Sequence, residues 1–165
     1  MKHPQADLVL PLYSEPYRIG LGTYRLGENT FSVCLRALEL GYRHIDTATL
    51  YRNERAVGEA VKQSGINRNE LFITTKVSVR DAENHNISDS VQKSIERLGH
   101  IDLILLHGPT SYIQRDWDVL CKQADTHGIP HTGVSNYRQE HLENLGSRIP
   151  AVNQIEVSPF LQRNQ

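Results

Sequence analysis

The chain has 165 residues, of which 38% are hydrophobic and 22% are charged, and its formal net charge is −1. This composition is typical of one globular domain, which we take as residues 1–165, and it excludes an intrinsically disordered chain. Without a basic block there is no electrostatic reason to expect nucleic acid as a partner. No apolar run approaches the roughly 20 residues of a membrane span, and the N-terminus lacks a signal-peptide core. We therefore expect a soluble, cytoplasmic protein with no membrane partner.

Apolar patterning predicts strands and helices in alternation. Runs of apolar and β-branched residues indicate six strands, at about residues 18–23, 44–46, 71–77, 101–106, 131–135 and 151–157. Apolar residues at helical spacing indicate five helices between them, at about residues 31–40, 54–64, 88–98, 113–127 and 138–145. Residues 7–22 suggest a small hairpin that leads into the first strand. Asn29-Thr30 and Ser88-Asp89 are the expected caps of the first and third helices.

Several residues have structural interpretations only. Cys34 and Cys121 fall within helical patterns and lack metal-ligand spacing, so we interpret both as buried free thiols and predict no metal site. Trp117 belongs to the inner stripe of its predicted helix. The charged positions of the 54–64 helix are interpreted as a solvated face, formed by Glu54, Arg55 and Glu59.

Strict alternation of strands with helix-length crossovers predicts a parallel sheet. Two architectures compete: an open doubly wound sheet and a TIM-type (β/α) barrel. Gly20-Leu21-Gly22 lacks the third glycine and the early helix of a dinucleotide-binding fingerprint. This absence favours the barrel, with about six of its eight βα units present in the chain.

Polar side chains recur where the predicted strands end. In a barrel the carboxyl ends of the strands meet at one mouth, where active sites lie. The spacing from the second strand to the fourth is about one βα unit per step, which predicts that these side chains converge. They are Asp46, Lys76, His107, Ser135 and Asn136.

These residue types suit the reduction of a carbonyl group. An aspartate beside Lys76 would hold its ammonium charged, and the ammonium beside Tyr51 would lower the pKa of the phenol from about 10. Tyr51 could then act as a general acid near neutral pH. His107 could donate a hydrogen bond to a carbonyl oxygen. No serine or cysteine nucleophile stands beside a histidine at a strand end, and there is no metal cluster, so a phenol acid with carbonyl-polarising donors favours reduction with a hydride supplied from outside the protein.

The chain resembles the aldo-keto reductases in seven motifs that follow one another in register from about residue 8 onward. They are Gly20-Leu21-Gly22-Thr23-Tyr24, Gly41-Tyr42-Arg43-His44-Ile45-Asp46-Thr47-Ala48, Tyr51-Arg52-Asn53-Glu54, Thr75-Lys76, Asp102-Leu103-Ile104-Leu105-Leu106-His107, Gly133-Val134-Ser135-Asn136 and Val152-Asn153-Gln154-Ile155-Glu156. The resemblance implies a (β/α)8 barrel that reduces aldehydes or ketones with NADP(H), or with NAD(H).

The resemblance also implies a role for each site residue. Tyr51 is the proton donor, Lys76 and Asp46 tune it, and His107 orients the carbonyl substrate. Three positions match those that hold the nicotinamide carboxamide, namely Ser135, Asn136 and Gln154. Thr23 and Asp46 match positions near the nicotinamide ribose, and Tyr24 matches an aromatic position of the substrate site.

The chain departs from the family pattern in two ways. It carries about six strands where the family barrel has eight, so we expect open edges on the first and sixth strands and self-association through them. Three smaller departures fall at substrate-pocket positions where the family often has bulky residues, and they predict a more open pocket or a different carbonyl substrate. They are Tyr24, Ser78 and Gly108.

Six of the site residues have a simpler explanation as well. Taken singly, Asp46 fits a turn cap, Lys76 a solvated strand end and His107 a structural histidine. Likewise a helix N-cap fits Ser135-Asn136, and a satisfied core amide fits Gln154. Two hypotheses follow. The first is an NADP-dependent carbonyl reductase, which is favoured by the occurrence of Asp46, Tyr51, Lys76 and His107 in register. The second is a truncated, non-catalytic relative or a fragment of a longer reductase, acting as a binding or structural protein.

Overall fold

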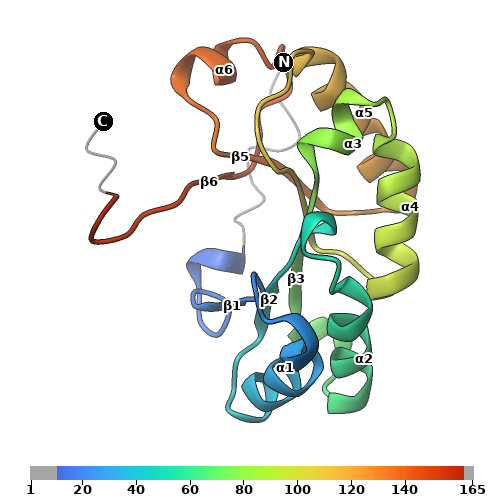
Figure 1. Ribbon diagram of the computed structural model, residues 1–165, viewed down its shortest axis with the longest axis vertical. Coiled ribbons are helices and arrows are strands. Elements are labelled where there is room, and N and C mark those ends of the chain that lie inside the picture. The colour runs from blue at the N-terminus through green and yellow to red at the C-terminus, as the bar shows by residue number, and fades with distance from the viewer. Residues whose placement is uncertain (1–10, 162–165) are drawn as a thin grey trace.

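The computed structural model describes residues 11–161. They form one parallel sheet of six strands whose spatial order follows the sequence (Figure 1). The strands are β1 (Gly20–Gly22), β2 (His44–Asp46), β3 (Phe72–Val77), β4 (Leu103–Leu106), β5 (His131–Ser135) and β6 (Asn153–Gln154). Within the described residues, β1 and β6 each pair with one neighbour only, so the two outer edges of the sheet are open.

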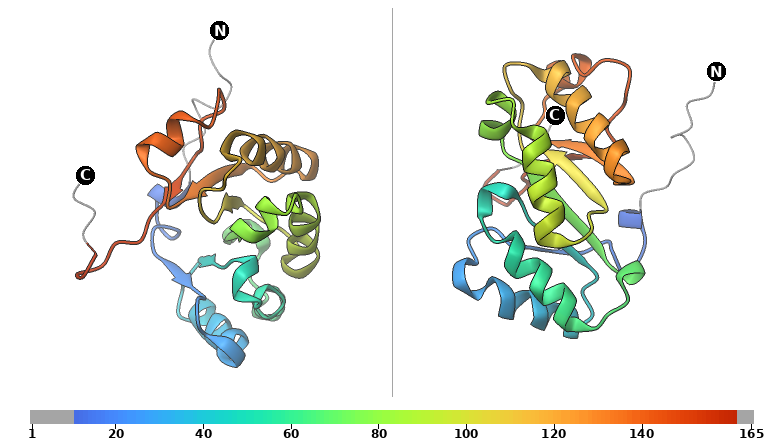
Figure 2. Two further views of the ribbon diagram at one scale, coloured as in Figure 1. Left: turned by 45° about the horizontal axis from the view of Figure 1, so that its top comes forward. Right: turned by 90° about the vertical axis from the view of Figure 1, so that its right-hand side faces the viewer.

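Helices connect the strands and cover the outer side of the curved sheet (Figure 2). They are α1 (Thr30–Glu39), α2 (Glu54–Ser64), α3 (Val79–Glu83), α4 (Ile87–Leu98), α5 (Ile113–His127) and α6 (Gln139–Glu143). Short 3-10 turns complete the chain, at η1 (Pro11–Tyr13), η2 (Gly27–Asn29), η3 (Thr49–Tyr51) and η4 (Arg68–Glu70). None of the helices in residues 11–161 is long and apolar enough to cross a membrane.

The sequential strand order decides between the two predicted architectures. A doubly wound sheet reverses direction at a switch point, so its spatial order differs from its sequence order. Here every crossover moves one strand in the same direction, from β1 to β6, which is how a (β/α) barrel grows. The prediction of an incomplete barrel is confirmed.

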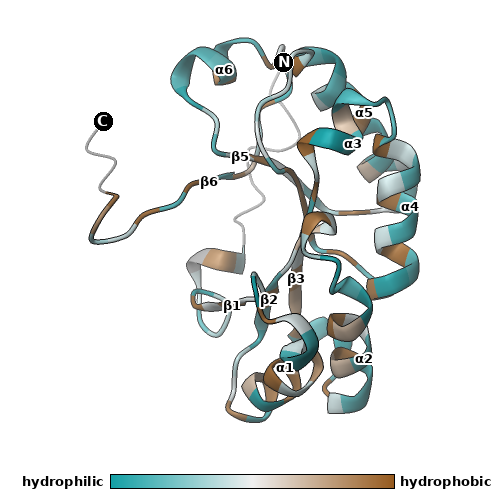
Figure 3. Cartoon of the chain, viewed as in Figure 1, coloured by the Kyte–Doolittle hydropathy of each residue, from teal (hydrophilic) through white to brown (hydrophobic). Residues whose placement is uncertain are grey.

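Because side chains alternate between the two faces of each strand, the apolar residues form an outer core beneath the helices and an inner core on the other face of the sheet. On β4, Ile104 and Leu106 pack outward against the helices, whereas Leu103 and Leu105 face inward with Phe72. The outer core is the larger of the two and includes the fully buried Trp117 of α5, as predicted. Apolar colour accordingly concentrates on the strands and on the helix faces that meet them (Figure 3).

Two predictions about local structure are wrong, and one helix was missed. The described part of the expected hairpin forms η1 and turns instead of a strand before β1, and residues 7–10 lie outside the described residues. The helix predicted from Ser88-Asp89 begins one residue earlier, at Ile87 with Asn86 as its N-cap. The sequence also gave no prediction of α3, whose five residues are too few to show a helical period, although the Ser78 hydroxyl caps it by accepting from the Asp81 amide at 3.0 Å.

Candidate active site

The inner face of the sheet carries several of the predicted site residues. The pairing register places His44 and Asp46 of β2 beside Phe72 and Thr74 of β3, and Lys76 follows two residues later on the same face. Because side chains alternate between the faces of a strand, these positions all point inward. The side chains at the carboxyl ends of neighbouring strands therefore meet at one mouth, as expected for a barrel.

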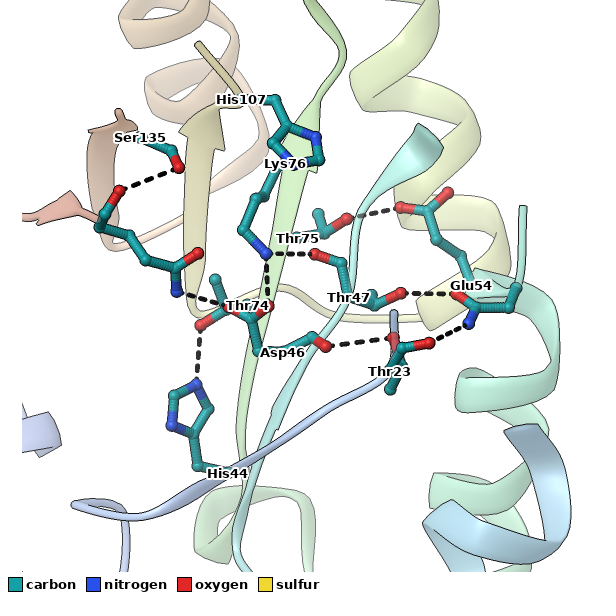
Figure 4. A network of polar contacts seen from close by, with 12 residues as sticks. Thr23, His44, Asp46, Thr47, Glu54, Thr74, Thr75, Lys76, His107 and Ser135 are labelled. Atoms are coloured by element: carbon teal, nitrogen blue, oxygen red, sulfur yellow. Dashed lines mark hydrogen bonds and ion pairs between the residues drawn. The ribbon is translucent and has the colours of Figure 1, made fainter. Parts of the chain in front are cut away.

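Lys76 lies at the centre of this mouth and is only 1% exposed. Its ammonium forms an ion pair with Asp46 Oδ1 and donates to the Thr47 carbonyl at 3.0 Å (Figure 4). The other Asp46 oxygen, Oδ2, accepts from Gln154 Nε2 at 2.8 Å. The pair thus joins β2, β3 and β6, three strands that are far apart in the sequence.

Tyr51 ends the η3 turn and places its ring over this pair. The Lys76 ammonium lies 5.4 Å from the ring centroid, and the Tyr24 and His107 rings flank Tyr51 at centroid distances of 5.1 and 5.6 Å. Burial, with smaller contributions from Asp46 and Tyr24, raises the pKa of Tyr51 to about 12.

The expectation that Lys76 lowers the pKa of Tyr51 is therefore wrong for this structure. The Asp46 carboxylate is paired with the ammonium and offsets its charge, so desolvation of the phenolate dominates. The phenol consequently keeps its proton through the neutral pH range, as a proton donor requires.

His107 directly follows β4 and turns its ring toward Tyr51. Burial lowers the pKa of His107 to about 4, and the neighbouring Lys76 ammonium acts in the same direction. The ring is therefore neutral near pH 7, with one N–H to donate. Its Nδ1 atom is buried without a hydrogen-bond partner.

An open pocket of about 460 Å³ lies above these groups. Six of the predicted site residues line it: Tyr24, Tyr51, His107, Ser135, Asn136 and Gln154. Asn136 has a left-handed backbone, with φ of 61°, and its amide donates to Ser135 Oγ at 3.1 Å. The Ser135 hydroxyl in turn donates to the Gln154 carbonyl at 3.0 Å, so these three residues form one polar wall.

Thr23 stands apart from the pocket. Its side chain is fully buried, and its hydroxyl donates to the Asp46 carbonyl at 3.1 Å. It therefore holds the ends of β1 and β2 together, and its predicted contact with a nicotinamide ribose stays a prediction.

Comparison with known proteins identifies the family. The model of the aldo/keto reductase family matches residues 18–165, nearly the whole chain. The chain belongs to the aldo/keto reductase family. The resemblance inferred from the seven motifs is confirmed.

Curated relatives within the aldo/keto reductase family are similar over most of this chain. An aldo-keto reductase from Mycolicibacterium vanbaalenii is 41% identical, covering 88% of this chain and 55% of its own length. The glycerol 2-dehydrogenase (NADP(+)) of Saccharomyces cerevisiae is 34% identical, covering 90% of this chain and 59% of its own. Methylglyoxal reductase DkgB of Salmonella typhi is 36% identical, covering 88% and 59%. The chain thus spans somewhat more than half the length of these relatives.

Solved structures of aldo/keto reductases have the same fold. The enzyme from Brucella melitensis superposes with a TM-score of 0.80 at 35% identity, over 87% of this chain and 60% of that one. The aldose reductase of Schistosoma japonicum gives a TM-score of 0.78 at 27% identity, over 84% and 56%. The described strands therefore correspond to part of the complete aldo/keto reductase barrel.

Two buried polar residues of this aldo/keto reductase chain were missed by the sequence analysis. Asn53 is 8% exposed and accepts from the Thr47 hydroxyl at 2.8 Å. Glu54 is 1% exposed, accepts from the Thr75 hydroxyl at 2.6 Å and pairs with Arg97 at 3.0 Å. The assignment of Glu54 to a solvated face is therefore wrong. Its spacing of three residues from Val57 was the available signal, because that spacing puts both on one helix face.

Proposed function

We propose that this chain forms the catalytic part of a carbonyl reductase that takes its hydride from NADP(H), or from NAD(H), and acts on small aldehydes or ketones. The observation that carries the proposal is the convergence of Asp46, Lys76, Tyr51 and His107 beneath one open pocket. The names of the similar glycerol 2-dehydrogenase (NADP(+)) and methylglyoxal reductase support the cofactor and the small carbonyl substrate.

The polar wall of the pocket fits the nicotinamide end of such a cofactor. A carboxamide needs both donors and acceptors, and Ser135, Asn136 and Gln154 offer hydroxyl and amide groups on one side of the pocket. A bound reduced nicotinamide would supply the hydride that adds to the carbonyl carbon.

The residues of the chain would orient, polarise and protonate the oxygen of the carbonyl group. His107, neutral near pH 7, would donate a hydrogen bond that orients the carbonyl and polarises it. Tyr51 would transfer its phenol proton to the oxygen as negative charge develops there, completing the alcohol. The Lys76 ammonium, held in place by Asp46, would keep the Tyr51 ring in position through its contact with the ring face.

Replacement of the Tyr51 hydroxyl tests the mechanism. The purified chain should reduce members of an aldehyde panel with NADPH, and Tyr51→Phe should lower kcat by about 100-fold or more, because the proton donor is lost. NADPH binding, followed by fluorescence titration, should persist in the variant. Tyr42→Phe, at a tyrosine outside the pocket, is the matched control and should keep full turnover. Equal turnover in wild type and Tyr51→Phe would refute the proposal.

A second candidate is cofactor binding without turnover. One observation favours it: among the described residues, the Tyr51 hydroxyl forms no hydrogen bond with Lys76 or His107. Catalytic hydrogen bonds often tighten only when substrate binds, so the first candidate remains the proposal. Saturable 1:1 binding of NADPH with no turnover on any aldehyde of the panel would instead support the second.

A further inference from the structure

A second hollow, of about 710 Å³, lies on the outer side of the molecule behind the η3 turn. The turn separates the two cavities, because Thr49 and Arg52 line the outer one whereas Leu50 and Tyr51 line the active-site pocket. The outer hollow, which we call the rear groove, is bounded by η3 and by residues of α2, α3 and α4. Its volume falls in the range of small-molecule sites, roughly 300–1,000 Å³.

The chemistry of its lining restricts what the rear groove could bind. Every residue that lines it is polar or charged, and none is aromatic or aliphatic. An apolar ligand would therefore find only the apolar stems of polar side chains, and a nucleobase would find no ring on which to stack. A compact, strongly polar ligand is the class that fits.

The sign of the charge on that ligand can be inferred from the charged side chains of the rear groove that have no ion-pair partner. Each acid in the rear groove is already engaged: Glu54 pairs with Arg97 at 3.0 Å, and Asp89 pairs with Lys93 at 2.6 Å. The third, Asp81, accepts from the neutral Ser78 hydroxyl at 2.8 Å, and among the described residues no ion pair engages it, so one carboxylate stands beside the cations of the groove.

Two arginines remain. Throughout residues 11–161, no hydrogen bond or ion pair engages the side chain of Arg52 or of Arg55, and both are exposed and line the rear groove. The groove therefore offers two uncommitted guanidinium groups to an anion.

The backbone adds two further observations. Arg52 has a φ of 58°, a left-handed conformation that is uncommon for a residue with a side chain and that can mark a functional site. Asn86 and Ser90, which line the groove, flank the first turn of α4, and Asp89 of that turn lines it as well, with its carboxylate paired to Lys93. The N-terminus of a helix favours negative charge through its free N–H groups.

We propose that the rear groove binds a compact phosphate-type polyanion, such as a pyrophosphate or a small phosphate ester. Arg52 and Arg55 contact the phosphate oxygens through the planar fork of the guanidinium, whose donors match phosphate geometry. The first turn of α4 provides backbone N–H groups on the other wall. This assignment does not depend on whether the chain reduces carbonyls.

The test is a titration of the whole ¹⁵N-labelled chain with inorganic pyrophosphate at constant ionic strength, followed by NMR. Saturable shifts are expected at the amides of Thr49, Arg52, Asn86 and Ser90. Arg52→Gln and Arg55→Gln should each weaken binding by about tenfold, because each removes one charged pair of hydrogen bonds. Both side chains are exposed and unpaired, so the variants should fold.

The matched control is Lys62→Gln, which removes the same charge from the same helix as Arg55 but lies outside the rear groove. Unchanged affinity in this variant supports the site. Equal weakening in Lys62→Gln, or shifts that do not saturate, would mean that pyrophosphate responds only to overall charge and would overturn the proposal. Citrate binding as tightly as pyrophosphate would overturn the phosphate class.

Discussion

At the scale of single residues, Asn53 joins the segments around Lys76. Its amide nitrogen donates to the Thr23 carbonyl at 2.9 Å and to Thr30 Oγ1 at 3.2 Å, and its oxygen accepts from Thr47 at 2.8 Å. Thr47 is also the residue whose carbonyl receives the Lys76 ammonium. One buried amide thus fixes the turn that holds Lys76 in place.

Removal of this amide should destabilise the fold. Asn53→Ala is expected to lower the free energy of unfolding by about 2–4 kcal/mol, because it leaves buried donors and acceptors without partners. Urea unfolding monitored by circular dichroism measures the change. The control Asn84→Ala removes an exposed asparagine side chain with no hydrogen bond among the described residues, and should stay within about 0.5 kcal/mol of wild type. Equal losses in both variants would contradict the role of Asn53.

His107 makes stability depend on pH. Its pKa falls from the ordinary value of 6.5 to about 4 in the folded chain. Between these values the unfolded chain binds more protons than the folded chain, so the free energy of unfolding falls as the pH drops from 6.5 toward 4. Above pH 6.5 the contribution of His107 to stability is constant. Burial lowers the pKa of His44 and His131 as well, and these act in the same direction.

The contribution of His107 can be isolated by substitution. His107→Gln should reduce the loss of melting temperature between pH 6.5 and pH 4.5, because it removes one of the groups that must gain a proton on unfolding. The remaining slope, meaning the change of melting temperature with pH, comes from the other titrating groups. His127→Gln, at an exposed histidine that ends α5, is the control and should keep the wild-type slope. An unaltered slope in His107→Gln would refute the assignment.

At the scale of elements, α2 and α4 approach each other closely at Gly58. A Cβ atom built at Gly58 would lie 2.0 Å from the Arg97 carbonyl oxygen of α4, far inside van der Waals contact. The ion pair of buried Glu54 and half-buried Arg97 joins the same two helices. The packing of α2 on α4 therefore depends on the absence of a side chain at Gly58 as well as on the ion pair.

Gly58→Ala should reverse the usual effect of that substitution. Alanine favours an isolated helix by about 1 kcal/mol over glycine, but here the clash with a backbone atom should cost more, for a net loss of about 1–3 kcal/mol in the free energy of unfolding. Chemical denaturation measures whether the variant is less or more stable than wild type. Glu59→Ala, at the exposed neighbouring position, should change stability by less than about 0.5 kcal/mol. A more stable Gly58→Ala variant would show that the helices are not in close contact.

At the scale of the whole molecule, the described sheet is open at both edges. Strands β1 and β6 each present unpaired backbone groups on one side, which is a template for pairing with another chain. The segment after β6 reaches away from the sheet (Figure 1) and exposes Ile155, Val157 and Phe160, the last of them fully. Open edges beside exposed apolar groups predict self-association of this chain.

Sedimentation velocity over a range of concentrations tests this prediction. The sedimentation coefficient should rise with concentration, and the double variant Val157→Lys/Phe160→Lys should lower that rise, because charged residues at an edge disfavour pairing. Lys122→Gln, at an exposed position on α5, is a control that leaves the edges unaltered. A well-folded monomer at every concentration would contradict the prediction.

The sequence by itself determined the order and type of nearly all elements, because each strand and helix carries its own apolar period. The 113–127 helix and the 131–135 strand match α5 and β5 to the residue. The short α3 was missed, since five residues cannot display a helical period. The seven motifs also sufficed for the family, and with it the choice of candidate site residues.

Only the tertiary structure decided how those residues act on one another. The ion pair of Lys76 and Asp46 joins positions 30 residues apart, and burial, rather than the lysine, determines the direction in which the pKa of Tyr51 shifts. Whether a charged residue such as Glu54 is buried depends on which helix packs beside it, here α4 with Arg97. Local periodicity specifies the elements, whereas burial and the pKa values depend on contacts that exist only once the strands are side by side.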